Sequence, residues 1–188
     1  MARNTTTAGS RKKAGTTPMK SEATMLQELF LDELRDIYYA EKLLMKQMPK
    51  MQKACTSDEL RSGFEEHLVV TEQQIARIEE VFEMMEVKPR AKKCEAMEGL
   101  VKEAQEIISE LPKGTSVRDA GLIIAAQKIE HYEIAAYGSL VQLAKTMSLN
   151  DVAGVLQETL DEEKAQDQVL TELAVSSINI EAENETEE

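Results

Sequence analysis

Apolar residues recur at intervals of three and four along most of the chain, which is the spacing of one face of an α-helix. This pattern predicts four long amphipathic helices, at about residues 24–54, 58–86, 116–147 and 150–176. The alternation of apolar and polar residues that is typical of a β-strand is found nowhere in the sequence. The sequence therefore predicts an all-α protein.

The connections indicate how these helices pair. Only a few residues separate the first helix from the second, and the third from the fourth, so each pair is expected to form an antiparallel hairpin. A long crossover, at about 87–115, joins the two hairpins and contains a shorter helical stretch, "CEAMEGLVKEAQEIISEL". Because two hairpins joined by a long crossover are the layout of ferritin-like bundles, we predict a ferritin-like four-helix bundle.

The composition fits helices and narrows the classes of function. Gly (8 residues) and Pro (4 residues) are scarce, and the net charge of −13 argues against a nucleic-acid-binding body. Two cysteines form no disulfide framework and fit a reducing compartment. No apolar run reaches the roughly 18–20 residues of a membrane span, and the N-terminus has no apolar signal core. We therefore expect a cytoplasmic protein without membrane contact.

The two ends differ from the middle of the chain in composition and charge. We therefore divide the chain into a disordered basic tail (1–20), a helical bundle (21–180) and an acidic tail (181–188). The first segment contains five basic residues and no acidic one. Such a tail could tether the protein weakly and nonspecifically to nucleic acid or membrane, or it could be a solubilising extension, which the composition favours.

Acidic side chains fall on or beside the apolar faces, near the midpoints of the predicted helices. In the third long helix, Glu130 and Glu133 lie within the apolar stripe. At similar depths lie Asp36, Glu41, His67, Glu162 and Glu163. A buried carboxylate must be protonated, paired or bound to metal, and one divalent cation or a pair of them would also offset the repulsion between several carboxylates. Oxygen-rich ligands with one imidazole suit iron or manganese better than zinc.

Chance offers a second explanation of these positions. Because 35 of the 188 residues are acidic, some glutamates will fall on an apolar face without any function. For any single glutamate a solvated or salt-bridged position is the simpler interpretation. The joint placement of Glu130 and Glu133 favours a functional one, and beside them His67 is as plausible a metal ligand as a core residue.

Six stretches of the sequence resemble one known family. They are "AEKLL", "MPKM", "HLVVTEQQIARIE", "KKCEAMEGLVKEA", "AAQKIEHYEIAAYGSL" and "ETLDEEKAQDQVLTELA". Over about residues 25–180 the chain is similar to the YciE/YciF family of bacterial ferritin-like proteins. The resemblance implies a homodimer, a dinuclear metal site in the bundle and a link to stress responses, but no particular reaction. It implies that the metal-facing residues are Glu41, His67, Glu130, Glu133, Glu162 and Glu163, with Asp36 as a weaker member.

One departure from the family pattern bears on the site. The family commonly reads His-Leu-Glu-Glu-Thr on the second helix, whereas this chain has Val69 and Val70 after His67 and Leu68. The Glu-x-x-His motif of ferritin-like sites is also missing, because Phe64 stands three residues before His67. Two functions stay open: a stress-associated protein with an iron or manganese site, asymmetric or weak, and a metal-free structural or interaction bundle with a degenerate site.

Overall fold

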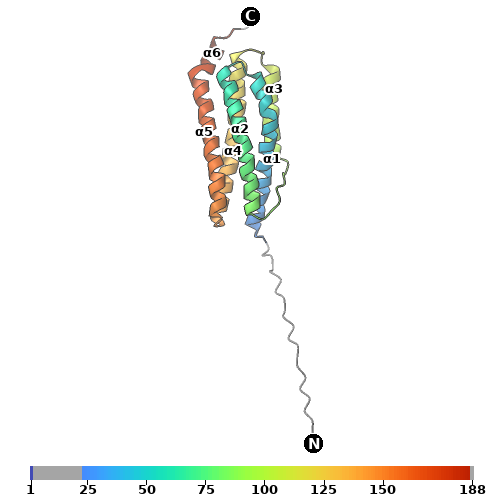
Figure 1. Ribbon diagram of the computed structural model, residues 1–188. Coiled ribbons are helices and arrows are strands. Elements are labelled where there is room, and N and C mark those ends of the chain that lie inside the picture. Colours follow the sequence, from blue (N-terminus) through green and yellow to red (C-terminus); the bar gives the residue numbers. More distant parts are fainter. Residues whose placement is uncertain (2–22, 187–188) are drawn as a thin grey trace.

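The computed structural model describes Met1 and residues 23–186, and this part of the chain is helical with no strand (Figure 1). The elements are α1 (Met25–Ala54), α2 (Asp58–Met84), α3 (Glu95–Glu110), α4 (Ser116–Thr146), α5 (Asn150–Leu173), the π-helix η1 (Ala174–Ile178) and α6 (Asn179–Asn184). The prediction of an all-α protein is confirmed for the described residues. The predicted basic tail lies, apart from Met1, outside them.

The four long helices lie side by side, with α1 packed against α2 and α4, and α5 packed against α4 and α2 (Figure 1). The start of α4 lies against the turn between α1 and α2, because Asp119 accepts hydrogen bonds from the backbone N–H groups of Thr56 (2.8 Å) and Ser57 (2.6 Å). Helices α2 and α4 therefore begin at the same end of the molecule. The chain must return along the bundle between them, and the crossover makes this return.

Helix α3 forms part of that return and is the main difference from the predicted four helices. It packs against α4 and α1. Gly121 of α4 permits the close approach, since a Cβ atom there would lie 2.8 Å from Ile107 Cγ2 and 2.9 Å from Leu111 Cδ1. In the part of the chain that the structure describes, five helices thus lie side by side rather than four.

The C-terminal helical segment extends beyond its predicted end at residue 176. Helix η1 continues α5 and leads into α6, so residues 181–184, which we assigned to an acidic tail, are helical. Glu185 then accepts hydrogen bonds from the backbone N–H groups of Ser116 (2.7 Å) and Val117 (3.0 Å). These groups open α4, where the helix dipole favours a negative charge, and their hydrogen bonds lower the pKa of Glu185.

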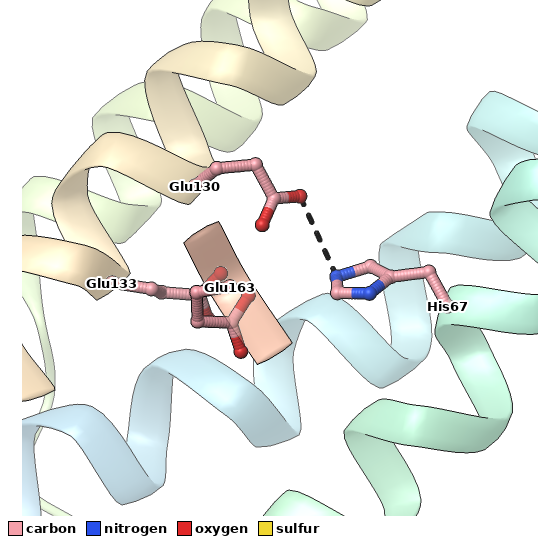
Figure 2. A group of neighbouring side chains, drawn as sticks. All are labelled: His67, Glu130, Glu133 and Glu163. Atoms are coloured by element: carbon pink, nitrogen blue, oxygen red, sulfur yellow. Dashed lines mark ion pairs between the residues drawn. The ribbon is translucent and has the colours of Figure 1, made fainter. Parts of the chain in front are cut away.

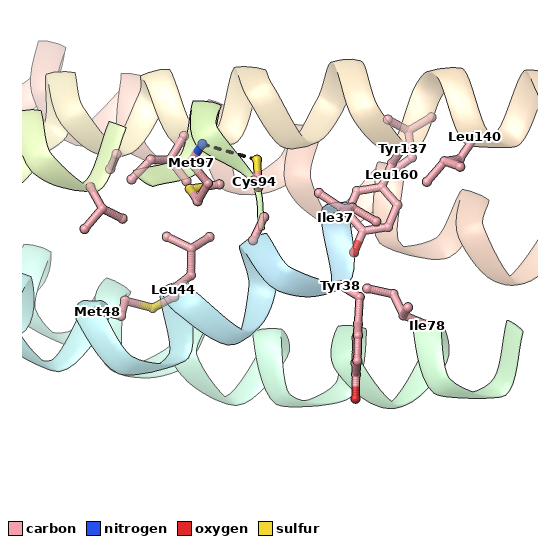
Figure 3. Close-up of a cluster of buried hydrophobic side chains, with 14 of the residues drawn as sticks. Ile37, Tyr38, Leu44, Met48, Ile78, Cys94, Met97, Tyr137, Leu140 and Leu160 are labelled. Atoms are coloured by element: carbon pink, nitrogen blue, oxygen red, sulfur yellow. Dashed lines mark hydrogen bonds between the residues drawn. The ribbon is translucent and has the colours of Figure 1, made fainter. Parts of the chain in front are cut away.

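The apolar core extends along the bundle between the long helices (Figure 3). Tyr38 of α1 packs edge-to-face on Phe82 of α2, with the ring centroids 5.6 Å apart. None of the helices within the described residues is both long enough and apolar enough to cross a membrane. The core is interrupted by a group of buried polar side chains, which forms the candidate site.

Candidate metal centre

Four side chains from three helices converge in the core of the bundle (Figure 2). They are His67 from α2, Glu130 and Glu133 from α4, and Glu163 from α5, and we call them the core cluster. Glu130 and Glu133 share one face of α4 because residues three apart are neighbours on a helix. One ligand atom from each of the four residues lies within 4.8 Å of those of the other three, and all four side chains are buried.

Among the described residues, most carboxylate oxygens of the core cluster have no hydrogen-bond partner. Both oxygens of Glu133, Oε2 of Glu130 and Oε2 of Glu163 are buried and unpaired. Glu130 Oε1 lies 3.5 Å from His67 Nε2, and Glu163 Oε1 accepts a hydrogen bond from Gln74 Nε2. Because buried polar atoms are nearly always paired, these four unpaired oxygens need an explanation, and a cation bound between them would provide one.

Burial and mutual repulsion keep protons on the carboxyl groups. Burial raises the pKa values of Glu130 and Glu133 well above the usual range, and the nearby charges of Glu163 and Glu41 raise them further. Burial raises the pKa of Glu163 to about 7, against the opposing effects of the hydrogen bond from Gln74 and the charge of Arg77. Burial lowers the pKa of His67 to about 4, so its imidazole is neutral and available to a metal at neutral pH. A divalent cation would displace the protons of the carboxyl groups.

Glu41 of α1 borders the core cluster. Its side chain is fully buried, Oε1 accepts a hydrogen bond from the Tyr137 hydroxyl, and Oε2 has no partner. Burial and the charge of Glu163 raise its pKa well above the usual range. Glu41 is not one of the four residues whose ligand atoms lie within 4.8 Å of one another, but it offers a further carboxylate beside them.

Two other predicted ligands are held by different partners. Asp36 Oδ2 accepts a hydrogen bond from the Tyr132 hydroxyl at 2.5 Å, and that hydroxyl also lies 3.0 Å from Cys94 Sγ. Glu162 forms a two-bond ion pair with Arg77, with both N–O distances 2.6 Å, and its side chain is 32% exposed. The structure therefore brings four of the seven predicted residues together, places Glu41 beside them, and leaves Asp36 and Glu162 outside the core cluster.

Two neutral polar residues on the face of α2 that carries His67 are absent from the predicted site. Thr71 and Gln74 are fully buried, and each has a side-chain oxygen without a partner. Gln74 Nε2 donates to Glu163 and also to Glu162 (3.2 Å), so it links the core cluster to the surface ion pair. They lie four and seven residues after His67, on the same face of α2, and this spacing could have identified them in the sequence.

The departure at Val69 does not remove a ligand from the core cluster. Val69 is 55% exposed and Val70 is half-buried. A carboxylate at position 69 would therefore lie at the surface of α2, turned away from the buried face that carries His67 and Gln74. The weak or degenerate site that we inferred from this departure has no support at Val69.

The fold and the core cluster define an all-helical protein with a carboxylate–histidine group buried between its long helices. Residues 25–183 match the family described as "Domain of unknown function (DUF892)", and the chain belongs to this family. It is 46% identical over 160 residues to Protein YciF of Escherichia coli strain K12, a match that spans 85% of this chain and 96% of YciF. The resemblance to the YciE/YciF family is thus confirmed.

Solved structures give the same result. The E. coli stress protein YciF matches with a TM-score of 0.79 and 44% identity over 84% of this chain and 99% of that one. YcfI from Rhodopseudomonas palustris, described as "a putative structural protein", matches with a TM-score of 0.77 and 39% identity over 81% of this chain and 96% of that one. A Xanthomonas campestris protein has the same fold, with a TM-score of 0.68 at 22% identity over 85% of this chain and 97% of that one.

Proposed function

We propose that this protein binds a divalent transition metal, iron or manganese, as one ion or a pair, in the core cluster with Glu41 beside it. In this interpretation the four long helices are a ferritin-like bundle and α3 is an addition to it. The observation that carries the proposal is the set of unpaired, buried carboxylate oxygens on Glu130, Glu133 and Glu163. Unpaired polar atoms in an apolar core cost free energy unless a ligand satisfies them.

The donor set fits these metals. Carboxylate oxygens with one neutral imidazole suit iron and manganese, and the cluster offers no thiolate. Bound iron or manganese would supply Lewis-acid or redox chemistry. The chain itself would hold the ion, exclude bulk water through the surrounding apolar core, and fix Glu41 and Glu163 through their hydrogen bonds with Tyr137 and Gln74.

The cellular role that we propose is a part in a stress response. It rests on the similarity to E. coli YciF, which is described as a stress protein. We propose a homodimer in the cytoplasm as the working form, on the resemblance and the composition alone.

A metal-free structural bundle is the second candidate. The hydrogen bonds from Tyr137 to Glu41 and from Gln74 to Glu163 accommodate two of the buried acids without any ion, and the raised pKa values of Glu130 and Glu133 allow these acids to stay neutral. The R. palustris relative is also described as structural.

Thermal unfolding of the double variant Glu130→Gln/Glu133→Gln distinguishes the two functions. If the core cluster binds metal, Mn²⁺ or Fe²⁺ should raise the Tm of the wild-type protein above its value in chelator. At a free metal concentration of 100 times Kd, the free energy of unfolding should rise by about 2.7 kcal/mol. The double variant should lose this gain. A matched control, Glu72→Gln/Glu172→Gln, changes two exposed glutamates and should retain it.

A metal-free bundle predicts a different pattern. The wild-type protein should then show no metal-dependent gain in Tm. The double variant should be as stable as the wild type or more stable, because neutral amides avoid the free-energy cost of keeping the buried acids protonated at neutral pH. A metal-dependent gain in the Tm of the wild type would therefore refute the metal-free bundle, and its absence would refute the metal site.

A further inference from the structure

An open groove lies at the end of α2, formed by the last turns of this helix and the chain that follows it. Its volume is about 610 Å³, and Ala76, Val87 and Pro89 supply apolar side chains to it. The charged side chains that line it are four glutamates and one lysine: Glu79, Glu80, Glu83, Glu86 and Lys88. The groove is therefore a negatively charged surface with apolar contacts, and it lies outside the core cluster.

The charges of this groove are unfavourable for α2 itself. Glu79 and Glu80 stand four and three residues before Glu83, so like charges are neighbours on the helix surface. The C-terminal end of a helix favours cations, yet the last turn of α2 contains no basic residue. None of the four glutamates forms an ion pair with another residue in the described part of the chain. A cationic partner in the groove would offset both effects.

The beginning of α1 lies at the end of the bundle that carries the groove. Helices α1 and α2 are neighbours joined by a turn at 55–57, so they run antiparallel (Figure 1). Tyr38 of α1 donates a hydrogen bond of 2.5 Å to Glu79 of the groove. The segment at 2–22 lies outside the described residues, and it joins the molecule at this same end, because α1 begins at Met25.

The segment that precedes α1 carries the opposite charge. Residues 1–20 contain five basic side chains and no acidic one, and three of the basic ones are consecutive, at Arg11, Lys12 and Lys13. An extended chain spans up to about 3.3–3.6 Å per residue, so this group can reach as far as roughly 40 Å from the first turn of α1. A short tether also keeps the effective concentration in the millimolar range, so weak ionic contacts are sufficient for docking.

From these observations we propose that the basic segment at residues 11–20 docks in the groove of its own chain. Its cations lie against the glutamates, and the carbon stems of its lysine and arginine side chains cover the apolar residues, since such side chains bury their stems and keep their charged heads near water or a partner. A segment held in this way is not available to tether the protein to nucleic acid or membrane. The proposal does not depend on a metal in the core cluster.

Paramagnetic relaxation in the full-length protein tests this docking. The variant Thr16→Cys would carry a nitroxide label between the basic residues of the segment, and the same treatment of the wild type checks that the two native cysteines, which are 6% and 2% exposed, stay unlabelled. In a ¹⁵N-labelled sample at low salt, the nitroxide should strongly broaden the backbone amide signals of Ala76 and Val87, which we call the groove amides. In about 1 M NaCl, where the screening length is about 3 Å, most of this broadening should be lost.

Two matched variants of the nitroxide-labelled protein locate the contact. Glu80→Gln/Glu83→Gln removes two charges from the groove, and Glu65→Gln/Glu66→Gln removes two exposed charges near the other end of the same helix. The first variant should lose most of the broadening at the groove amides, and the second should keep it. Undiminished broadening in the first variant would overturn the proposal, and so would broadening in the parent protein that does not respond to salt.

A mixed sample shows which chain supplies the segment. Equal amounts of ¹⁵N-labelled protein without nitroxide and of unlabelled protein with nitroxide report contacts between molecules only. We expect little broadening of the groove amides in this mixture. Broadening that approaches half of that in the doubly labelled sample would mean that the segment docks on a second copy of the chain, and it would overturn docking within one chain.

Discussion

Replacing Glu163 by Gln should have opposite effects with and without metal. The substitution keeps the size of the side chain and removes its charge, and the new amide oxygen can still accept the hydrogen bond that Gln74 donates to Glu163 Oε1. In the metal-free protein the variant loses an unfavourable buried charge. In the metal-bound protein it loses a ligand.

The size of the metal-free effect follows from the pKa of Glu163, which burial raises from 4.5 to about 7. Below the unfolded-state pKa both states are protonated and the group has no effect. As the pH rises the unfolded chain ionises first, so the folded state loses stability until the pH passes its own pKa. At about 1.36 kcal/mol per pKa unit, the wild-type carboxyl group costs about 3 kcal/mol at pH 8 and about 1 kcal/mol at pH 5.

Urea unfolding followed by circular dichroism measures this directly. In chelator, Glu163→Gln should be more stable than the wild type by about 3 kcal/mol at pH 8, and by only about 1 kcal/mol at pH 5. In Mn²⁺ at pH 8 the wild type should gain stability and the variant should gain little. The control Glu172→Gln, an exposed change on the same helix, should behave like the wild type. A variant less stable than the wild type in chelator at pH 8, or equally stabilised by Mn²⁺, would refute the reasoning.

Three other predictions follow from the same structure. The metal-free wild type should lose stability from pH 6.5 to pH 8, since its buried carboxyl groups have raised pKa values and its histidine is already neutral; chemical unfolding across this range tests it, and a flat profile contradicts it. Gly121→Ala should lower the free energy of unfolding by about 1–2 kcal/mol, because the added methyl group clashes with α3. The control Gly154→Ala meets no atom within 4 Å and should raise it by roughly 0.5–1 kcal/mol. Equal effects of the two variants in urea unfolding would argue against close packing at Gly121. Val69→Glu should leave Mn²⁺ stabilisation unchanged, because the side chain is 55% exposed, and a marked gain in Tm would show that position 69 reaches the metal.

The helices could be predicted from the sequence because each one buries a single apolar face, which leaves a period of 3.6 residues in the sequence. The stretch that forms α3 was also predicted as helical. Its packing against α1 and α4 was not, because periodicity shows that a helix has a buried face but not which helices cover it. The C-terminal segment was predicted too short, since its acidic composition concealed the continuation through η1 and α6.

The centre of the site was predictable for the same reason that the helices were. Glu130 and Glu133 stand in the middle of an apolar stripe, where the pattern favours a buried position for the pair. Asp36 and Glu162 stand at the margins of theirs, and their surroundings depend on Tyr132 and Arg77, which are distant in the sequence. Periodicity cannot reveal such partners.

Gln74 illustrates a different limit of sequence reasoning. A neutral amide in a sequence with many charged residues gives no indication of a site, although the Gln74 side chain is fully buried and donates a hydrogen bond to Glu163. The homodimer and the cytoplasmic location stay predictions.

Metal content is the most direct test of the central claim. The full-length protein and the variant Glu130→Gln/Glu133→Gln would be produced in medium with iron and manganese, purified without an affinity tag or chelator, and analysed by mass spectrometry of the metals. We predict near-stoichiometric iron or manganese in the wild type and its loss in the variant. Equal metal content in the two proteins, or none in the wild type under repeated preparation, would contradict a metal centre at the core cluster.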